Sequence, residues 1–433
     1  MAQLLIKGGR VIDPAQGVDR KADVLIANGR IAAVGPGGTG VAPVGHRQDT
    51  YAIVDAAGLI VAPGLIDMHV HFREPGNEAE ETIASGAAAA VAGGFTAVAV
   101  MPNTDPAVDN EPAVAFQVAQ GERAGLCRVL PVGAVSVGRK GERLAEMGQM
   151  VRAGAVGFSD DGDPVRGPRL MRTALQYAAM LGKPILAHCE DKDLAGKGVM
   201  HAGLWATKLG LGGIPSAAEE VMVARDLILA EATGGKLHVT HVSTRGSVRL
   251  IRDAKKRGVP VTADVAIHHL VLTDEAVAGY DPNLKMNPPL RSAEDAEALR
   301  AALADGTIDC LVSDHAPHAA EEKDVEFALA PFGIIGLETT LPLVVTKLIE
   351  PGLLTWPQAI AALTCNPARV LGIEAGTLAV GRPADLTLID PTAEWTIDAA
   401  KFRSKARNCP FHGWAVRGRA AATIVGGAIK FRA

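Results

Sequence analysis

The sequence predicts an α/β fold: a (β/α)8 barrel of the TIM type with a small discontinuous β-domain built from both chain ends. Three observations lead to this prediction. Eight short apolar runs alternate with helix-like segments between about residues 64 and 340. Histidine or aspartate closes several of these runs. The chain ends differ from this middle part, because their short alternating runs are joined by turn residues.

The eight apolar runs have the length and spacing expected of parallel strands separated by helices. Glycines stand before several of them and are suited to end the preceding helix. The first helix is expected over residues 78–91, because acidic residues precede an alanine-rich body and Gly93 follows it. The predicted strands cover residues 64–71, 95–103, 128–136, 155–161, 184–190, 236–243, 260–267 and 307–315.

A doubly wound open sheet is the competing arrangement for alternating strands and helices. It is disfavoured because no G-x-G-x-x-G sequence opens a helix after the first strand. The candidate ligands also follow many strands, whereas an open sheet gathers its ligands at one switch point. The barrel is therefore the preferred prediction.

The two chain ends are predicted to form one domain together. Residues 1–62 and 376–433 carry short alternating runs joined by Gly, Asn and Asp turns, which are typical of antiparallel strands. Neither end is long enough to bury a core alone, so we expect them to pair beside a barrel of residues 63–375. Residues 35–45 form a glycine-rich, flexible-looking patch.

Composition excludes several classes of function. A net charge of −5 and an aromatic content of 4% give no basis for binding nucleic acid or an anionic membrane. No apolar run approaches the roughly 18 residues of a membrane span. The five cysteines are odd in number and far apart, which fits a reducing compartment. We expect a cytoplasmic protein that acts on a small molecule.

Two histidines, two residues apart, end the first predicted strand. His69 and His71 in DMHVHFREPG share one face of that strand, so both can bind one metal ion at its carboxyl end, where barrel enzymes keep their chemistry. Alone, such a pair is equally consistent with packing. His188, His241 and Asp314 close three later runs in the same way, and this repetition predicts a metal site.

A mixed histidine and aspartate set favours a catalytic ion such as zinc over a structural one. Strand four adds Asp160 or Asp161; neighbours on a strand face opposite ways, so the residues alone leave this choice open. Six donors exceed one tetrahedral ion. One or two Zn²⁺ ions per subunit are therefore expected, with a bridging carboxylate and a water of lowered pKa between two of them.

Three further side chains are placed to bind a substrate. Arg73, just past the histidine pair, offers a guanidinium that can hold a carboxylate through two hydrogen bonds. The alternative for Arg73 is a salt bridge with Glu74 or Glu78. Asn103 in MPNT ends the second strand, although it is also a suitable turn or cap residue, and His318 in SDHAPH follows the eighth.

These motifs together resemble the bacterial class I dihydroorotases of the amidohydrolase superfamily. The resemblance rests on DMHVHFREPG, MPNT, GFSDDG, AHCED, HVSTRGS, KMNPPLR, SDHAPH and APFGIIGLET, which span nearly the whole chain. It implies a zinc-dependent, reversible cyclisation of N-carbamoyl-L-aspartate to L-dihydroorotate in de novo pyrimidine (UMP) biosynthesis. A homo-oligomer is expected, and a complex with aspartate transcarbamoylase is compatible with this activity.

The resemblance also implies roles for individual residues. The metal ligands would be His69, His71, Asp161, His188, His241 and Asp314, with Asp161 preferred to Asp160 by the family pattern. Asp314 would also be the general acid/base. The substrate contacts would be His71, Arg73, Asn103, Asn287 and His318, together with Phe332 and Gly333 through their backbone. His268 and His269 are expected to be loop or supporting residues and not ligands.

Two features separate dihydroorotases from their relatives. Many superfamily members bridge their metals with a carbamylated lysine from strand four, but GFSDDG contains no lysine, so a carboxylate must serve. Allantoinases carry Asn where this chain has Arg73, and hydantoinases lack the carboxylate clamp. The alternatives are a hydantoinase-like or allantoinase-like enzyme, and an inactive structural partner of aspartate transcarbamoylase. Such a partner is expected to have lost ligands, and all are present here.

Overall fold

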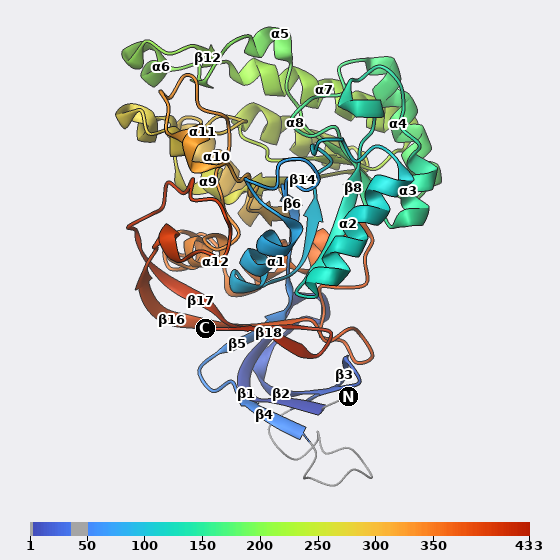
Figure 1. The fold of residues 1–433 in the computed structure, drawn as a ribbon, viewed down its shortest axis with the longest axis vertical. Coiled ribbons are helices and arrows are strands. Elements are labelled where there is room, and N and C mark those ends of the chain that lie inside the picture. The colour runs from blue at the N-terminus through green and yellow to red at the C-terminus, as the bar shows by residue number, and fades with distance from the viewer. Residues whose placement is uncertain (1–2, 36–50) are drawn as a thin grey trace.

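The computed structural model describes residues 3–35 and 51–433. Eight parallel strands form one sheet in chain order (Figure 1). A parallel bridge between Val70 and His315 brings the chain after the last strand to the first strand, so the sheet nearly closes. The predicted barrel is confirmed. Its strands are β6 (Leu65–Val70), β7 (Phe95–Val100), β8 (Arg128–Gly133), β9 (Gly157–Phe158), β10 (Ile185–Ala187), β13 (Leu237–Val239), β14 (Val261–Ala266) and β15 (Cys310–Val312).

Helices surround this barrel and bury its strands. All six residues of β7 are buried, as expected for a parallel sheet that is covered on both faces. Besides α1 (Ile83–Ala92), the helices outside the loops at the barrel mouth are α2 (Glu111–Ala124), α3 (Met147–Ala153), α4 (Pro168–Met180), α7 (Ser216–Thr233), α8 (Arg245–Lys256), α10 (Ala293–Ala304), α12 (Thr340–Val344), α13 (Trp356–Leu363) and α14 (Cys365–Leu371). Within the described ranges, none of the helices is both long and apolar enough to cross a membrane.

The first barrel helix begins later than predicted. α1 (Ile83–Ala92) starts after Thr82, whose hydroxyl accepts a hydrogen bond from the Ser85 N–H in a capping box. The acidic residues expected in the first turn lie in the preceding loop instead, at residues 78–81. The predicted helix end is confirmed, because Gly93 follows α1 as its C-cap.

Shorter elements extend the loops at the carboxyl ends of the barrel strands. They lie at the end of the barrel that faces away from the terminal strands (Figure 1). These elements are α5 (Lys192–Ala195), β11 (Met200–His201), α6 (Leu204–Leu209), β12 (Gly213–Ile214), α9 (Ile267–Val271) and α11 (Ala320–Lys323).

Both chain ends contribute to a second eight-stranded sheet (Figure 1). The two ends meet where β5 pairs antiparallel with β16, and their apolar side chains share one core. The exact domain boundaries stay a prediction, and the patch 35–45 lies outside the described residues apart from Gly35. The strands are β1 (Gln3–Asp13), β2 (Val18–Ala27), β3 (Arg30–Gly35), β4 (Tyr51–Asp55), β5 (Ile60–Pro63), β16 (Leu386–Thr396), β17 (Ala415–Val425) and β18 (Ala428–Arg432).

Two buried threonines join the terminal sheet to the barrel. The Thr387 hydroxyl on β16 donates to the Gly94 carbonyl at 2.6 Å and accepts the Leu65 N–H at 3.2 Å. The Thr423 hydroxyl on β17 donates to the Val91 carbonyl at 2.7 Å. Leu65 is the first residue of β6, so the terminal sheet fixes the start of the strand that carries the histidine pair.

We expect Thr387→Val to lower the free energy of unfolding by about 1–3 kcal/mol, because it leaves two buried main-chain groups without partners. Thr392→Val is the matched control on the same strand, where the side chain is exposed, and should change stability by less than about 0.5 kcal/mol. Thermal and urea unfolding measure both. Equal stability of the two variants would contradict the role assigned to Thr387.

Candidate active site

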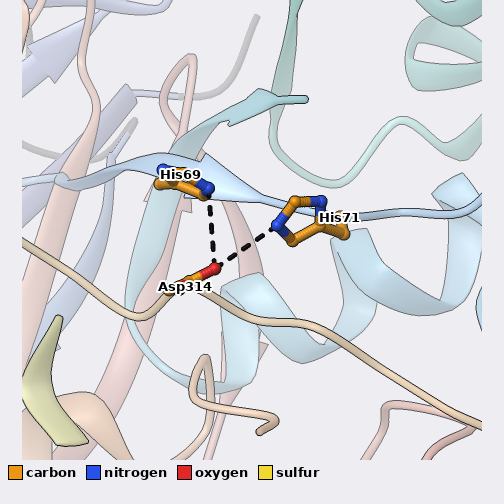
Figure 2. Close-up of side chains that lie close together, drawn as sticks. All are labelled: His69, His71 and Asp314. Carbon is orange, nitrogen blue, oxygen red and sulfur yellow. Dashed lines mark hydrogen bonds and ion pairs between the residues drawn. The ribbon is translucent and has the colours of Figure 1, made fainter. Parts of the chain in front are cut away.

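The histidine pair and Asp314 meet at the mouth of the barrel. His69 lies on β6, His71 follows it, and Asp314 lies two residues beyond β15. Asp314 Oδ1 is 3.5 Å from His69 Nε2 and 3.3 Å from His71 Nε2. Figure 2 shows both rings directed at this one oxygen. The period of two along a strand therefore places both imidazoles toward the same point.

Asp161 is the centre of the cluster, because its carboxylate reaches all four histidines. The distances to Asp161 are 3.4 Å from His69 Nε2, 3.6 Å from His71 Nε2, 3.5 Å from His188 Nδ1 and 3.3 Å from His241 Nε2. The structure thus brings all six predicted ligands into one buried group. Their role as ligands stays a prediction.

Asp160 points away from this group. Its carboxylate accepts the main-chain N–H groups of Val135 and Ser136, at 2.9 and 3.0 Å, and the Ser136 hydroxyl at 2.5 Å. It therefore holds the loop that follows β8. The sequence left open whether Asp160 or Asp161 is the ligand from strand four, and this geometry favours Asp161.

The electrostatics of the cluster favour positive charge between its carboxylates. Burial lowers the pKa of His69, but the negative charges of Asp161 and Asp314 outweigh burial and raise the pKa to about 10. Burial also lowers the pKa of His188, but contacts with Asp161 and Glu190 outweigh burial and raise that pKa to about 9. Burial also opposes ionisation of Asp314, yet the charge of His69 holds that pKa below its ordinary value.

Several buried donor atoms of the cluster fit a metal ion. Both ring nitrogens of His69 and Nδ1 of His241 have no hydrogen bond to the described residues. An unsatisfied buried polar group costs about 1–3 kcal/mol, and coordination would supply the missing partner. Two overlapping groups of donor atoms lie within 4.8 Å of one another: His69, His71 and Asp314, and His69, Asp161 and His241.

Buried carboxylates support the backbone beneath the cluster. Asp67 accepts the N–H groups of His69 at 3.1 Å and of Ser313 at 3.0 Å. Burial raises the pKa of Asp67 to about 7. Asp264 accepts the His241 N–H at 2.6 Å. The main chain that carries three predicted ligands is thus fixed by side chains of β6 and β14.

A cavity of about 300 Å³ opens above the cluster. Most of the predicted metal and substrate residues line it: His71, Arg73, Asn103, Asp161, His188, His241, Asn287, Asp314, His318 and Phe332. His69 lies beneath it, since its side chain is fully buried.

Arg73 faces this cavity from the loop after β6. Its Nε is 3.0 Å from Glu80 Oε2 and donates to the Pro317 carbonyl at 3.2 Å. The ion pair considered with Glu74 or Glu78 is not the one that forms. Both contacts use Nε, so the two terminal nitrogens make no hydrogen bond to the described residues and remain available to a ligand.

Asn103 contacts a member of the cluster, and Asn287 contacts Glu190 beside the cluster. Asn103 Oδ1 is 2.8 Å from His71 Nδ1, which orients the ring so that Nε2 faces the carboxylates. Asn103 lies three residues beyond β7, so it does not end the strand as predicted. The Asn287 amide donates to Glu190 Oε2 at 3.2 Å. Their predicted substrate contacts stay predictions.

His318 joins the two loops at the far side of the cavity. Its Nε2 is 2.9 Å from the Phe332 carbonyl, and burial and the charge of Arg73 lower its pKa to about 3, so the ring is neutral. Gly333 lies behind Phe332. A Cβ at Gly333 would lie 2.7 Å from the Ala316 carbonyl oxygen, so only glycine fits there.

Sequence reasoning missed three charged residues of this site. Glu190 lies 3.4 Å from His188 Nε2 and forms an ion pair with Lys192. The i, i+2 spacing that relates His69 to His71 also relates His188 to Glu190, and this signal was available. Glu80, the partner of Arg73, had no such signal.

The histidines after strand seven are fully buried in α9, and the expectation of a loop there was wrong. His269 Nε2 is 2.9 Å from the Pro288 carbonyl. His268 makes no hydrogen bond to the described residues. Neither histidine belongs to the groups of donor atoms that could hold an ion.

Comparison with known proteins agrees with this geometry. The family profile described as dihydro-orotase-like matches residues 58–247, and the amidohydrolase family profile matches residues 230–431. The dihydroorotase of Pelotomaculum thermopropionicum is 57% identical, covering 99% of this chain and 98% of the relative. The dihydroorotase of Pelobacter propionicus is 54% identical over 99% of each chain.

Among solved structures, an L-hydantoinase (dihydropyrimidinase) from Arthrobacter aurescens superposes with a TM-score of 0.86 at 27% identity. The match covers 99% of this chain and 96% of the other. A nearly closed parallel barrel with a histidine and aspartate cluster at its mouth defines an enzyme of the amidohydrolase class. Within that class, the chain belongs to the dihydro-orotase-like family.

We expect Asp161→Ala to lose bound metal, whereas Asp160→Ala should retain it. Asp161 contacts four predicted ligand rings, and Asp160 only holds the loop after β8. Metal affinity should fall by more than the roughly 10–100-fold seen when a supporting residue is lost. Metal analysis after dialysis, with thermal unfolding of both variants, checks this. Equal metal loss in the two variants would contradict the assignment.

Proposed function

We propose that this protein is a dihydroorotase, which reversibly cyclises N-carbamoyl-L-aspartate to L-dihydroorotate. The observation that carries the proposal is the position of Arg73, whose guanidinium lines the same cavity as the histidine and aspartate cluster. A carboxylate held by Arg73 would leave the rest of a small substrate over the cluster. The full-length relatives named dihydroorotase support this choice of substrate.

We propose zinc as the metal, in one or two ions per subunit. Nitrogen and carboxylate donors without thiolates suit a borderline divalent ion in a catalytic site. The ligands would be His69, His71, Asp161, His188, His241 and Asp314, with Asp161 at the centre because it reaches all four rings. When bound, zinc would polarise the carbonyl group that is attacked and lower the pKa of a water molecule.

The residues of this chain then bind the substrate and move one proton. Arg73, Asn103 and His318 would hold the α-carboxylate, with Arg73 through its free terminal nitrogens. In ring opening, the oxygen of water bonds to the ring carbonyl carbon and the carbon–nitrogen bond breaks. Asp314 takes the proton from water and gives it to the departing nitrogen. Its Oδ2 has no hydrogen bond to the described residues and can carry that proton.

Cyclisation follows the same path in reverse. The ureido nitrogen bonds to the carbon of the protonated side-chain carboxyl group, and Asp314 accepts the nitrogen's proton. The carbon–oxygen bond then breaks as Asp314 gives that proton to the departing hydroxyl, which leaves as water. One group thus acts first as base and then as acid in each direction.

Two alternatives are less well supported. A hydantoinase-like or allantoinase-like substrate has no carboxylate that would use the terminal nitrogens of Arg73. An inactive structural partner of aspartate transcarbamoylase would not be expected to preserve six donors in one buried cluster. A cytoplasmic location is supported by the five cysteines, all of which are free. The homo-oligomer and the complex with aspartate transcarbamoylase stay predictions.

We expect Arg73→Gln to lower kcat/KM for dihydroorotate by roughly 30-fold or more. Truncating a desolvated, charge-assisted contact costs about 2–5 kcal/mol, at about 1.4 kcal/mol per tenfold. Metal content should not change, because arginine is not a ligand. Steady-state kinetics with dihydroorotate and with an uncharged hydantoin measure the effect, which should be much smaller for the hydantoin.

Glu80→Gln is the matched control for this experiment. If Arg73 served only as the ion-pair partner of Glu80, then Glu80→Gln would reproduce the loss. An Arg73→Gln variant with the kcat/KM of the wild-type protein would remove the main reason for choosing this substrate.

The pH profiles of the two directions should be opposed. Asp314 has a lowered pKa, so its base form, which both directions need, is present at neutral pH and is lost only as the pH falls. Ring opening also uses a water molecule that loses a proton and should rise with pH to a plateau. Cyclisation consumes the protonated side-chain carboxyl group of the substrate and should fall as the pH rises. Initial rates in both directions between about pH 5 and 10 test this. Parallel profiles in the two directions would contradict the shared acid/base.

A further inference from the structure

Residues 404–408 come from the C-terminal part of the chain and lie against the barrel mouth. The Ser404 hydroxyl donates to Glu81 Oε2, and the Lys405 N–H donates to Glu81 Oε1 at 3.3 Å. Glu81 Oε2 is also 3.4 Å from Nε2 of His315, the neighbour of Asp314. These contacts fix the segment beside the loop that follows β15.

Asn408 in this segment is buried and uses its whole amide. Its Oδ1 accepts the main-chain N–H of His318 at 3.2 Å. Its Nδ2 donates to the main-chain carbonyls of Ala316 at 2.9 Å and Gly333 at 3.0 Å. Its own carbonyl accepts the Ile335 N–H at 3.1 Å. Asn408 therefore ties residues 316–318 to residues 333–335.

These two loops carry candidate substrate contacts on one side of the cavity. The His318 ring meets the Phe332 carbonyl, and both side chains line the cavity. The loops already approach so closely that Gly333 has no room for a Cβ. The spacing of the two loops therefore depends on hydrogen bonds to their main-chain groups. Asn408 supplies three polar groups to these bonds: its side-chain oxygen, its side-chain nitrogen and its main-chain carbonyl.

We propose that Asn408 is a positioning residue for substrate binding: it holds His318 and the Phe332–Gly333 backbone at the spacing that the substrate requires. This inference rests on the proposed dihydroorotase function. Asparagine is suited to the position because it presents two donors to two carbonyls and one acceptor to an N–H. An aspartate would direct an oxygen at both carbonyls, and an apolar residue would leave three buried groups without partners.

The test is a double-mutant cycle with Asn408→Asp and His318→Ala. Asn408→Asp retains the side-chain size and the acceptor for the His318 N–H. We expect it to raise KM for dihydroorotate roughly tenfold or more, with unchanged metal content and a smaller change in kcat. If Asn408 acts through His318, the KM increase in the double variant should be clearly less than the product of the single increases.

Asn366→Asp is the matched control. The Asn366 amide donates to the Asp309 carbonyl at 2.7 Å, before β15 and thus at the opposite end of the barrel. This variant should lower Tm and leave KM unchanged. If Asn408→Asp does not fold, Asn408→Ser takes its place in the same cycle, with the same expectations.

The outcomes separate this inference from the proposed function. A wild-type protein without activity on dihydroorotate would contradict the proposed function. An active wild-type protein with unchanged KM in the folded Asn408 variant, or fully multiplicative effects in the cycle, would overturn the positioning role alone.

Discussion

The contact of one carboxylate with four imidazoles is the constraint on which the rest of the site depends. Asp161 lies within 3.6 Å of all four rings, in a place almost closed to solvent. Such a group can be assembled only if strands from around the barrel end at one level. The main chain is strained at two of these residues, because His241 and Asp314 have positive φ angles of 35° and 48°. Each such residue costs about 1–3 kcal/mol, and this cost is typical of functional sites.

The C-terminal part of the chain supports this site at both ends of the barrel. Thr387 fixes the start of β6 at the lower end, and Asn408 ties two loops at the mouth. The chain after β16 must therefore pass along the outside of the barrel before it returns to the terminal sheet as β17. A barrel without its C-terminal part would lose main-chain partners beside the proposed substrate site as well as a covering sheet.

Hydrophobic pattern predicted the eight barrel strands because parallel strands buried on both faces are continuous apolar runs. The same reasoning failed for residues that lie beyond the ends of the strands. β9 ends at Phe158, so alternation could not decide between Asp160 and Asp161. The helix start at residue 78 was wrong because the acidic residues serve partners at the barrel mouth. Asn408 had no sequence signal, because it lies 90 residues from His318 along the chain.

The charge balance around Arg73 would let the proposed substrate site select a carboxylate and still release it. His318 is neutral, and Glu80 lies 3.0 Å from the Arg73 guanidinium. A substrate carboxylate would share Arg73 with Glu80. That sharing weakens the attraction between Arg73 and the substrate carboxylate, compared with an unpaired guanidinium. A neutral substrate would still gain no ionic attraction from Arg73. A reversible enzyme must release a carboxylate in both directions, and a guanidinium partly neutralised by Glu80 satisfies that requirement.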